Sequence, residues 1–332
     1  MKKTVVLYYR LPDALLERLR SVCNVRYFPG GVSPDVRPEF DAALQEAEGL
    51  IGTGVPKLEI NEELLSRAPK LKVFATISVG YDNCDVSALT RHRVLLTHTP
   101  GVLTDTTADT IFAVLLATAR RVVELGTMVK QRQWTRGIGG DLFGVNVHHK
   151  VMGILGMGRI GTAVAQRARG FDMPVIYADL NRNIDAEQRF GAQRMDLDDV
   201  LRQADYVCIT LQLTKETTGL INEERLALMK PSAILVNGAR GPIIDENALA
   251  DALRNGVIRA AGLDVFSQEP LPLDSPLIDL PNAVLFPHMG SATHETRYAM
   301  MECAVENLIG ALHGTLRKNI VNTELLMEGS EQ

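Results

Sequence analysis

A glycine-rich turn between an apolar run and a helix-forming segment constrains the fold of this chain more than any other feature. The stretch V-M-G-I-L-G-M-G-R-I-G, from Val151 to Gly161, contains the pattern G-x-G-x-x-G. Gly156 permits the tight turn that leaves the strand, Gly158 leaves no Cβ in the way of a pyrophosphate, and Gly161 lets the helix pack close to the strand. The motif predicts a dinucleotide-binding βαβ unit because it stands between a strand-like and a helix-like segment.

The residues after the turn extend this prediction to the ligand. The motif leads into a predicted helix, whose free N–H groups and positive dipole end favour an anion. Arg159 can add a cation nearby, and Ile160 follows it within the motif. The next strand-like run, Val175–Ala178, ends at Asp179, where a carboxylate would accept hydrogen bonds from an adenosine ribose. The same charge would repel a 2′-phosphate. The sequence therefore favours NAD(H), while the nearby Arg182 leaves NADP(H) open.

Strand-like and helix-like segments alternate along the whole chain. Its 332 residues are too many for one ordinary core, which predicts two domains. Short β-branched runs separated by helical stretches are typical of α/β folds with parallel sheets and helices on both faces. The expected strands are Val5–Tyr9, Gly49–Thr53, Val73–Ile77, Val94–Thr97, Val151–Leu155, Val175–Ala178, Tyr206–Leu211, Ala233–Val236, Gly262–Val265 and Val284–Phe286.

The domain boundary carries no flexible linker. Thr99-Pro100-Gly101 interrupts the pattern, and one long helix is expected from about Thr104 to Lys130. A first α/β domain is therefore expected to end near residue 100. Another helix can be predicted with both ends, since Asp245 is a good N-cap and Gly256 is suited to follow its last turn.

Composition gives no indication of a nucleic-acid, membrane or metal partner. The net charge is −5, no apolar run is long enough to span a bilayer, and the first residues do not resemble a signal peptide. The four cysteines are scattered without a C-x-x-C pair, which predicts neither disulfides nor a zinc site. His148 and His149 are adjacent but lack a third ligand pattern. We expect a cytoplasmic protein with reduced thiols.

Three polar residues follow strand-like segments beyond the glycine-rich turn, namely Arg240, Glu269 and His288. Ligands of open α/β sheets bind outside the carboxyl ends of the strands, so these side chains could meet at one edge. Each also has a purely structural interpretation. Arg240 could form a surface ion pair, Glu269 could belong to a solvated turn, and His288 could be a hydrogen-bonded core residue. Sequence spacing leaves the choice open.

These three residue types suit the reduction of a carbonyl next to a carboxylate. Hydride addition leaves an alkoxide that needs a proton, and histidine is the usual donor near neutral pH. A glutamate beside the histidine would stabilise the imidazolium and orient the ring. An arginine can bind a carboxylate through two parallel hydrogen bonds and so orient the substrate.

In its motifs, the chain resembles the D-isomer-specific 2-hydroxyacid dehydrogenases along nearly its whole length. Four stretches carry the resemblance: G-I-L-G-M-G-R-I-G at 153–161, V-N-G-A-R-G-P-I-I-D-E at 236–246, G-L-D-V-F-S-Q-E-P at 262–270 and P-H-M-G-S-A-T-H-E-T-R at 287–297. Within that family it is most similar to the bacterial glyoxylate/hydroxypyruvate reductases, also called 2-ketogluconate reductases. I-S-V-G-Y-D-N at 77–83, V-H-H-K at 147–150 and the stretch at 290–297 carry this closer match.

The resemblance implies a fold of two flavodoxin- or Rossmann-like, doubly wound parallel-sheet domains with the active site in the cleft between them. Residues 1–100 plus 289–332 would form the substrate-binding domain, and residues 101–288 the NAD(P)-binding domain. The first domain would then be discontinuous, which spacing alone does not reveal. Relatives of this kind imply a homodimer that is joined through the cofactor domain.

The resemblance also implies a role for each motif residue. His288 would be the general acid/base, Glu269 its partner, and Arg240 the clamp for the substrate carboxylate. The backbone of Val79 and Gly80 would line the substrate site. The further cofactor contacts that it implies are Gly238, Ala239, Asp264 and Gly290.

The implied activity is NAD(P)H-dependent reduction of small 2-oxo acids, such as glyoxylate, hydroxypyruvate or 2-keto-D-gluconate, to D-2-hydroxy acids. Two rival activities remain. A nicotinamide-sensing, corepressor-like binding protein would keep the same arginine, glutamate and histidine, and a dehydrogenase for another donor such as formate would keep the cofactor site but change the substrate pocket. The chain lacks the long basic extension that would favour the first. One departure concerns the cofactor: relatives that prefer NADPH often carry arginine and no acid after the second strand, whereas here the residues are D-L-N-R at 179–182.

Overall fold

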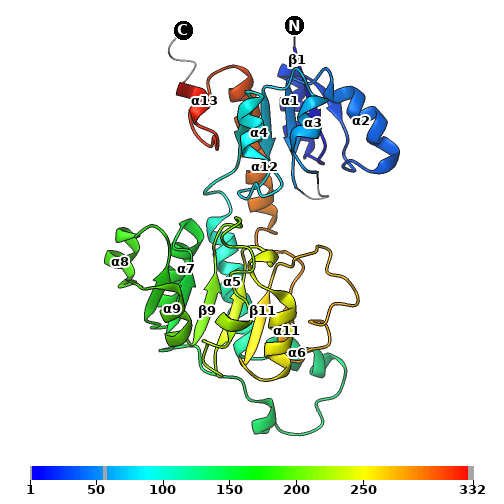
Figure 1. The fold of residues 1–332 in the computed structure, drawn as a ribbon. Helices are drawn as coiled ribbons and strands as arrows, with labels where there is room; N and C mark the ends of the chain where they lie inside the picture. The colour runs from blue at the N-terminus through cyan, green and yellow to red at the C-terminus, as the bar shows by residue number, and fades with distance from the viewer. Residues whose placement is uncertain (1, 55–57, 328–332) are drawn as a thin grey trace. The chain divides into compact units, whose positions relative to one another are not determined.

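The computed structural model describes residues 2–54 and 58–327, and it divides into two compact units (Figure 1). Met1–Leu103 together with Thr293–Gln332 form the first unit, and Thr104–Ala292 form the second. The first unit is therefore discontinuous. The expected boundaries, after residues 100 and 288, fall a few residues before the observed ones.

The first unit is built on a parallel five-stranded sheet with the strand order β2-β1-β3-β4-β5. Its strands are β1 (Lys3–Leu7), β2 (Cys23–Tyr27), β3 (Gly49–Gly52), β4 (Val73–Thr76) and β5 (Leu95–Thr97). This is the flavodoxin-like order. Successive residues of β1 alternate between the two faces of the sheet, since Val5 and Leu7 join one core cluster and Val6 joins the other.

Helices cover both faces of this sheet. On one face lie α1 (Asp13–Val22) and α12 (His294–Leu312), which contribute Leu15, Leu19 and Leu308 to the core with Val5 and Leu7. On the other face lie α2 (Arg37–Leu44), α3 (Glu62–Ser66) and α4 (Val86–Arg91). The short α13 (Glu324–Met327) ends the described chain.

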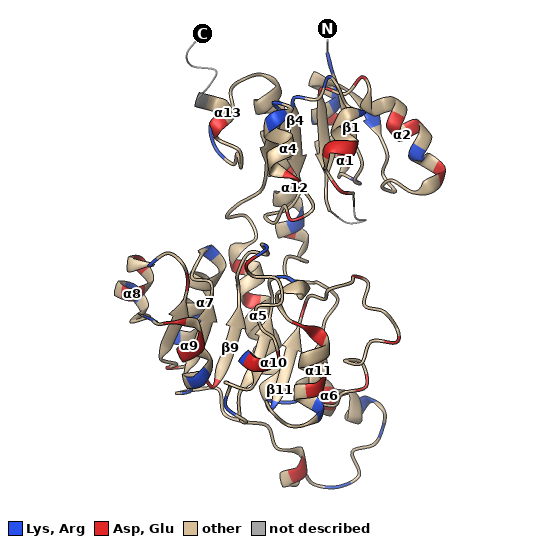
Figure 2. Cartoon of the chain, in the orientation of Figure 1, with Lys and Arg blue, Asp and Glu red and all other residues tan. Residues whose placement is uncertain are grey.

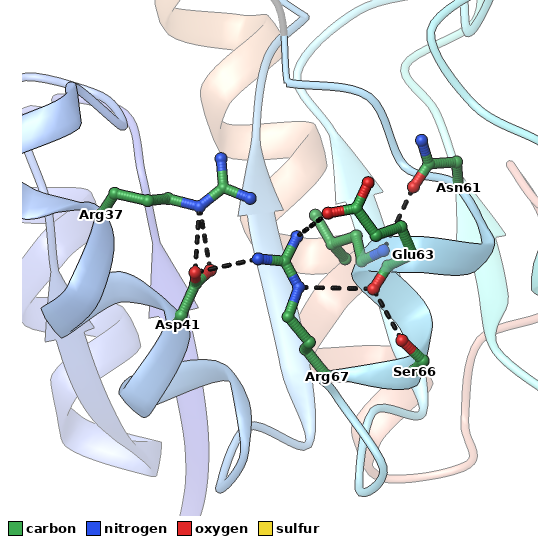
Figure 3. A network of polar contacts seen from close by, with 7 residues as sticks. Arg37, Asp41, Asn61, Glu63, Ser66 and Arg67 are labelled. Carbon is green, nitrogen blue, oxygen red and sulfur yellow. Dashed lines mark hydrogen bonds and ion pairs between the residues drawn. The ribbon is translucent and has the colours of Figure 1, made fainter.

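A network of charged side chains connects α2 with the end of α3 (Figure 3). Arg37 donates from Nε to both carboxylate oxygens of Asp41, at 3.0 and 3.1 Å. Asp41 also accepts a hydrogen bond from Arg67 Nη1 at 2.9 Å, and Arg67 in turn pairs with Glu63 at 3.4 Å. Asn61 caps the N-terminus of α3. The network therefore fastens two helices of the same sheet face to each other.

The second unit contains a parallel seven-stranded sheet in the order β12-β11-β10-β9-β6-β7-β8. Its strands are β6 (Met152–Leu155), β7 (Val175–Ala178), β8 (Gln193–Arg194), β9 (Tyr206–Ile209), β10 (Ile234–Asn237), β11 (Ala260–Leu263) and β12 (Ala283–Leu285). The order reverses between β6 and β9, which is the Rossmann switch point where nucleotides bind. The predicted fold class, two doubly wound α/β domains, is confirmed.

Two hydrophobic clusters enclose this sheet. One is formed with α5 (Thr104–Ala119), α7 (Arg159–Arg169) and α8 (Ile184–Phe190). The other is formed with α9 (Leu197–Gln203), α10 (Glu223–Leu226) and α11 (Glu246–Arg254). The predicted cap of α11 is confirmed, because the Asp245 side chain accepts from the N–H groups of Asn247 and Ala248. Gly256 follows with a φ of 68°.

The expected long helix from Thr104 to Lys130 is wrong, because the segment is two helices, α5 and α6 (Val122–Lys130). Arg121 stands between them with a φ of 55°. The carbonyl of Ala119 accepts a hydrogen bond from the N–H of Val145 at 2.8 Å, so a distant segment binds the end of α5. This tertiary contact competes with helix continuation, and a local apolar pattern cannot reveal it.

The charged residues of both units are mixed in sign along their helices (Figure 2). Acidic residues are more numerous, at 40 Asp and Glu against 35 Lys and Arg. In the described ranges, no helix combines the length and the apolar character that crossing a membrane requires.

Candidate active site

His288 and Glu269 form a direct pair in the second unit. His288 Nδ1 lies 2.6 Å from Glu269 Oε2, and the other oxygen, Oε1, accepts from the backbone N–H of Phe266 at 3.0 Å. His288 follows β12 and has a left-handed backbone with a φ of 53°, while Glu269 follows β11. The structure therefore brings together two side chains whose contact could not be decided from sequence spacing. The contact holds the imidazole ring through Nδ1 and not through Nε2.

Electrostatics keep Glu269 ionised. Burial raises the pKa of this carboxyl, but the hydrogen bonds from His288 and Phe266 and the positive charges of His288 and Arg240 outweigh it, so the pKa lies below its usual value. The reverse holds for Asp264, which is 2% exposed. Its burial raises the pKa above the usual value, although the N–H of Met289 favours the charged form.

Asp264 positions the backbone around His288. Its Oδ1 accepts from the N–H of Met289 at 2.8 Å. A Cβ on Gly290 would stand 3.2 Å from Asp264 Oδ2, so glycine allows the close approach of this loop. The buried acid thus holds the segment on the C-terminal side of His288.

Arg240 lies in a turn after β10 that Asn237 shapes. The buried Asn237 side chain donates to the carbonyl of Arg240 at 2.9 Å and accepts from the N–H of Ala239 at 3.0 Å. Arg240 Nη1 donates to the carbonyl of Ala239 at 2.8 Å. A Cβ on Gly241 would lie only 1.9 Å from the carbonyl carbon of Phe266, so this turn packs against the loop that carries Glu269. Arg240 and Glu269 are therefore placed by touching loops.

The glycine-rich turn has the geometry that its sequence predicts. Gly156 adopts a φ of 98°, and a Cβ on Gly161 would lie 2.0 Å from the Gly156 carbonyl oxygen. Thr210, which follows β9, donates to the same carbonyl oxygen at 2.6 Å and so ties the turn across the switch point. Strand β6, helix α7 and the turn between them are therefore closely packed.

This turn fits the pyrophosphate of a dinucleotide. Gly158 is exposed, no side chain caps the helix, and a Cβ at Gly158 would meet no atom within 4 Å. Packing therefore gives no reason for glycine at this position, whereas the approach of a ligand does. Arg159 and Ile160 begin α7, where free N–H groups and the helix dipole favour an anion.

Asp179 lies at the end of β7 and contacts the turn directly. Its Oδ2 accepts from the N–H of Met157 at 2.7 Å, and its Oδ1 accepts from the N–H of Asn181 at 2.9 Å. Each carboxylate oxygen keeps a second lone pair for a ribose hydroxyl. Asp179 thus has a structural role in the turn that its sequence position did not disclose.

Gly238, another expected cofactor contact, has a packing role in the structure. A Cβ on Gly238 would overlap the side chain of Ile111 at 2.4 Å, so helix packing alone explains that glycine.

Val79 and Gly80 lie in the first unit after β4, where the Val79 carbonyl accepts from the His98 ring. The N–H groups of Val79 and Gly80 have no hydrogen-bond partner among residues 2–54 and 58–327. In the same ranges no three His, Cys, Asp or Glu residues cluster as a metal site would require.

Known proteins resemble this chain in sequence over most of its length. The family described as "D-isomer specific 2-hydroxyacid dehydrogenase, NAD binding domain" matches residues 112–290. Glyoxylate/hydroxypyruvate reductase B of Serratia proteamaculans (strain 568) is 57% identical over 327 residues, which cover 98% of this chain and 99% of the relative. The chain belongs to the D-isomer-specific 2-hydroxyacid dehydrogenase family.

Solved structures share the fold of this dehydrogenase over nearly its whole length. The TT0316 protein from Thermus thermophilus has a TM-score of 0.87 at 42% identity, covering 96% of this chain and 99% of its own. The NADPH-dependent glyoxylate/hydroxypyruvate reductase of Sinorhizobium meliloti, solved with NADP and malonate, has a TM-score of 0.84 at 28% identity, covering 97% of both chains. The protein is an oxidoreductase that uses a nicotinamide cofactor.

Three residues that organise the dehydrogenase site were not predicted from the sequence: Asn237, Gly241 and Thr210. Asn237 and Gly241 flank Arg240 in V-N-G-A-R-G-P, and a polar residue ending a buried strand is itself a signal of a structured turn. Thr210 is the first residue after β9 and gave a similar signal. These residues hold loops in place.

Proposed function

We propose that this enzyme reduces small 2-oxo acids, namely glyoxylate, hydroxypyruvate and 2-keto-D-gluconate, to D-2-hydroxy acids. The observation that carries the proposal is the 2.6 Å contact between His288 Nδ1 and Glu269, at the same sheet edge as the glycine-rich turn. The relatives named glyoxylate/hydroxypyruvate reductase B support the first two substrates. Sequence resemblance alone suggests the third.

His288 acts as the general acid through Nε2, because Nδ1 is engaged by Glu269. The bound nicotinamide supplies the hydride to the carbonyl carbon of the substrate. The proton from His288 then neutralises the oxygen, and the charge of Glu269 favours the imidazolium that makes this donation possible. In the reverse direction, the same imidazole accepts the proton of the hydroxy acid.

Arg240 binds the substrate carboxylate, and the backbone N–H groups of Val79 and Gly80 contribute to the substrate site. Guanidinium forms two parallel hydrogen bonds with a carboxylate, which fixes the direction of the adjacent carbonyl. The unpaired N–H groups at Val79 and Gly80, judged among the described residues, are suitable donors for an anion.

The cofactor is bound mainly by the loops that follow β6, β7, β10 and β11. Asp179 accepts hydrogen bonds from the adenosine ribose and disfavours a 2′-phosphate, so NAD(H) is preferred and NADP(H) is used less well. The full proposed set is Gly156, Gly158, Arg159, Ile160, Gly161, Asp179, Gly238, Ala239, Asp264 and Gly290.

We further propose that the enzyme is a cytoplasmic homodimer. In α6 and the segment after it, six large apolar side chains are between 47% and 59% exposed: Val122, Val123, Val129, Trp134, Ile138 and Phe143. Exposed apolar groups of this number in one segment are typical of a protein–protein contact. Analytical ultracentrifugation tests the dimer, and Phe143→Ser should weaken it if this segment forms the interface.

The decisive experiment for the activity is a steady-state panel of 2-oxo acids with NADH and with NADPH. Turnover of glyoxylate or hydroxypyruvate supports the proposal. Cofactor binding without turnover of any 2-oxo acid would favour a nicotinamide-sensing binding protein. Oxidation of formate alone, in a parallel assay with NAD⁺ and NADP⁺, would identify a different dehydrogenase.

A further inference from the structure

The loop after β7 is hydrogen-bonded to both backbone groups of one residue of the glycine-rich turn. Asp179 Oδ2 accepts from the N–H of Met157 at 2.7 Å, and Asn183 Nδ2 donates to the carbonyl of Met157 at 2.8 Å. Met157 stands between Gly156 and Gly158, the two glycines of the cofactor turn. The three residues between Asp179 and Asn183 are therefore held beside that turn.

Arg182 lies in this held loop, and its guanidinium is occupied by Glu187. Arg182 Nε donates to both Glu187 oxygens at 3.0 Å, and Nη2 donates to Oε2 at 2.7 Å. Glu187 comes from α8, the helix that the loop leads into. The pair uses the bidentate geometry with which arginine also binds phosphate.

Glu187 is itself held in place by the sheet. Its Oε1 accepts a hydrogen bond from the Tyr177 hydroxyl at 2.9 Å, and Tyr177 is a fully buried residue of β7. The Glu187 side chain is 16% exposed, whereas that of Arg182 is 65% exposed. The carboxylate is thus the fixed member of the pair and the guanidinium the movable one. The hydrogen bonds from Arg182 and Tyr177 also hold the pKa of Glu187 below its usual value, so it stays charged at neutral pH.

Arg194, a second arginine beside the loop after β7, makes different contacts. Arg194 of β8 donates to the backbone carbonyls of Asp179 and Leu180, at 2.9 and 3.0 Å from Nη2. Those contacts fix the backbone of the loop and involve no carboxylate. Arg182 is therefore the cation whose availability depends on one acidic side chain.

We propose that Glu187 strengthens the preference for NAD(H) that Asp179 creates, because it competes with a cofactor 2′-phosphate for Arg182. The inference rests on the proposed use of Asp179 at the adenosine ribose. With Glu187 in place, NADP(H) must displace a bidentate carboxylate partner before it gains the charge of Arg182. NAD(H) lacks the phosphate and is indifferent to the pair.

The test is a comparison of Glu187→Gln with Asp185→Asn. Glutamine keeps an acceptor for Tyr177 but removes the charge that holds Arg182. Asp185 is a matched control on the same helix, where it pairs with Arg189 at 2.9 Å and is 63% exposed. Dissociation constants are measured by calorimetry for NADH, NADPH, AMP and adenosine 2′,5′-bisphosphate. The last two ligands probe the adenosine corner without any turnover.

Glu187→Gln should tighten binding of NADPH and of the bisphosphate by about 3- to 10-fold and leave NADH and AMP unchanged, since a bidentate pair near a surface is worth that much at most. Asp185→Asn should change none of the four. The double variant Glu187→Gln with Arg182→Gln should lose the gain. An equal effect of the two single carboxylate variants, or a gain that survives in the double variant, would overturn the proposal.

Arg182→Gln alone decides the question if Glu187→Gln fails to fold. An arginine that Glu187 already occupies contributes little to NADPH, so the variant should weaken NADPH binding by less than about twofold. A loss of about 10-fold in NADPH affinity would show that Arg182 reaches the phosphate despite Glu187, and the proposal would be wrong. These constants decide the inference even if no 2-oxo acid is turned over, which would instead refute the proposed activity.

Discussion

Two corners of the second unit lie at the carboxyl ends of strands in one sheet, yet they are built in opposite ways. At the ends of β11 and β12, Glu269 binds His288 with one oxygen and the Phe266 N–H with the other. At the end of β7, the pair of Arg182 and Glu187 links two side chains, and Arg182 is 65% exposed. One corner is anchored in the backbone, and the other depends on an exposed side chain that can exchange partners.

The difference separates catalysis from specificity. A general acid must keep its geometry, and fixed dipoles cost no reorganisation when charge develops. A preference between two cofactors requires only about 1.4 kcal/mol for each factor of ten, which one charged side chain can provide. We therefore expect large effects from substitutions in the first corner and small, cofactor-dependent effects in the second.

The largest effect is expected for His288→Ala. Loss of the proton donor should reduce kcat by about 10²–10⁴-fold while cofactor binding stays nearly intact. Steady-state kinetics with a titration of NADH by fluorescence measure the two quantities separately. A variant with near wild-type kcat would remove His288 from the mechanism.

Arg240→Lys should come next. Lysine keeps the charge but loses the planar fork, so the substrate is held less firmly and less well oriented, and kcat/KM should fall by roughly 100-fold. We expect KM to rise and kcat to fall together in initial-rate measurements. A change confined to cofactor affinity would instead assign Arg240 to the cofactor site.

Glu269→Gln should change the pH dependence of the reaction. The lowered pKa of Glu269 means that its carboxylate remains charged at and above its usual titration range, and that charge is lost only when the pH falls through the lowered value. At neutral pH it therefore places a negative charge 2.6 Å from His288 Nδ1. Glutamine removes this charge, so reductase activity should be lost at a lower pH than in the wild type as the pH rises. Profiles of kcat/KM against pH test this, and coinciding profiles would contradict it.

Much of this architecture can be predicted from local sequence, and the predictions that fail share a cause. The glycine-rich turn could be predicted because Gly161 must lie against the Gly156 carbonyl whatever the rest of the chain does. The end of α5 could not, because it depends on Val145, which lies 26 residues beyond Ala119. Strands β2 and β8 lie at the edges of their sheets and lack a buried apolar run, so the sequence pattern does not predict them: only Cys23 of β2 is buried, and both residues of β8 are exposed.

The functional residues divide in the same way, into those whose position local sequence predicts and those that act through contacts with distant segments. Arg240, Glu269 and His288 each follow a strand-like run, so parallel strands bring them to one edge. The residues that hold them, Asn237 and Asp264, act through loop contacts that spacing does not encode. Asp179 belongs to both groups, since its position after β7 could be predicted but its hydrogen bond to Met157 could not.

The smallest effect is expected for substitution of Asp179. Because Asp179 also accepts a hydrogen bond from the Met157 N–H, two variants are needed to separate its charge from its structural role. Asp179→Ala should shift kcat/KM toward NADPH by up to about 10-fold, since the repulsion of a 2′-phosphate disappears. Alanine also removes the acceptor of the Met157 N–H, which should weaken both cofactors together. Asp179→Asn keeps a carbonyl acceptor and loses only the charge. If charge sets the preference, both variants shift the ratio equally, and only alanine lowers both affinities. A wild-type enzyme that prefers NADPH at fixed ionic strength would show that Asp179 does not determine the choice of cofactor.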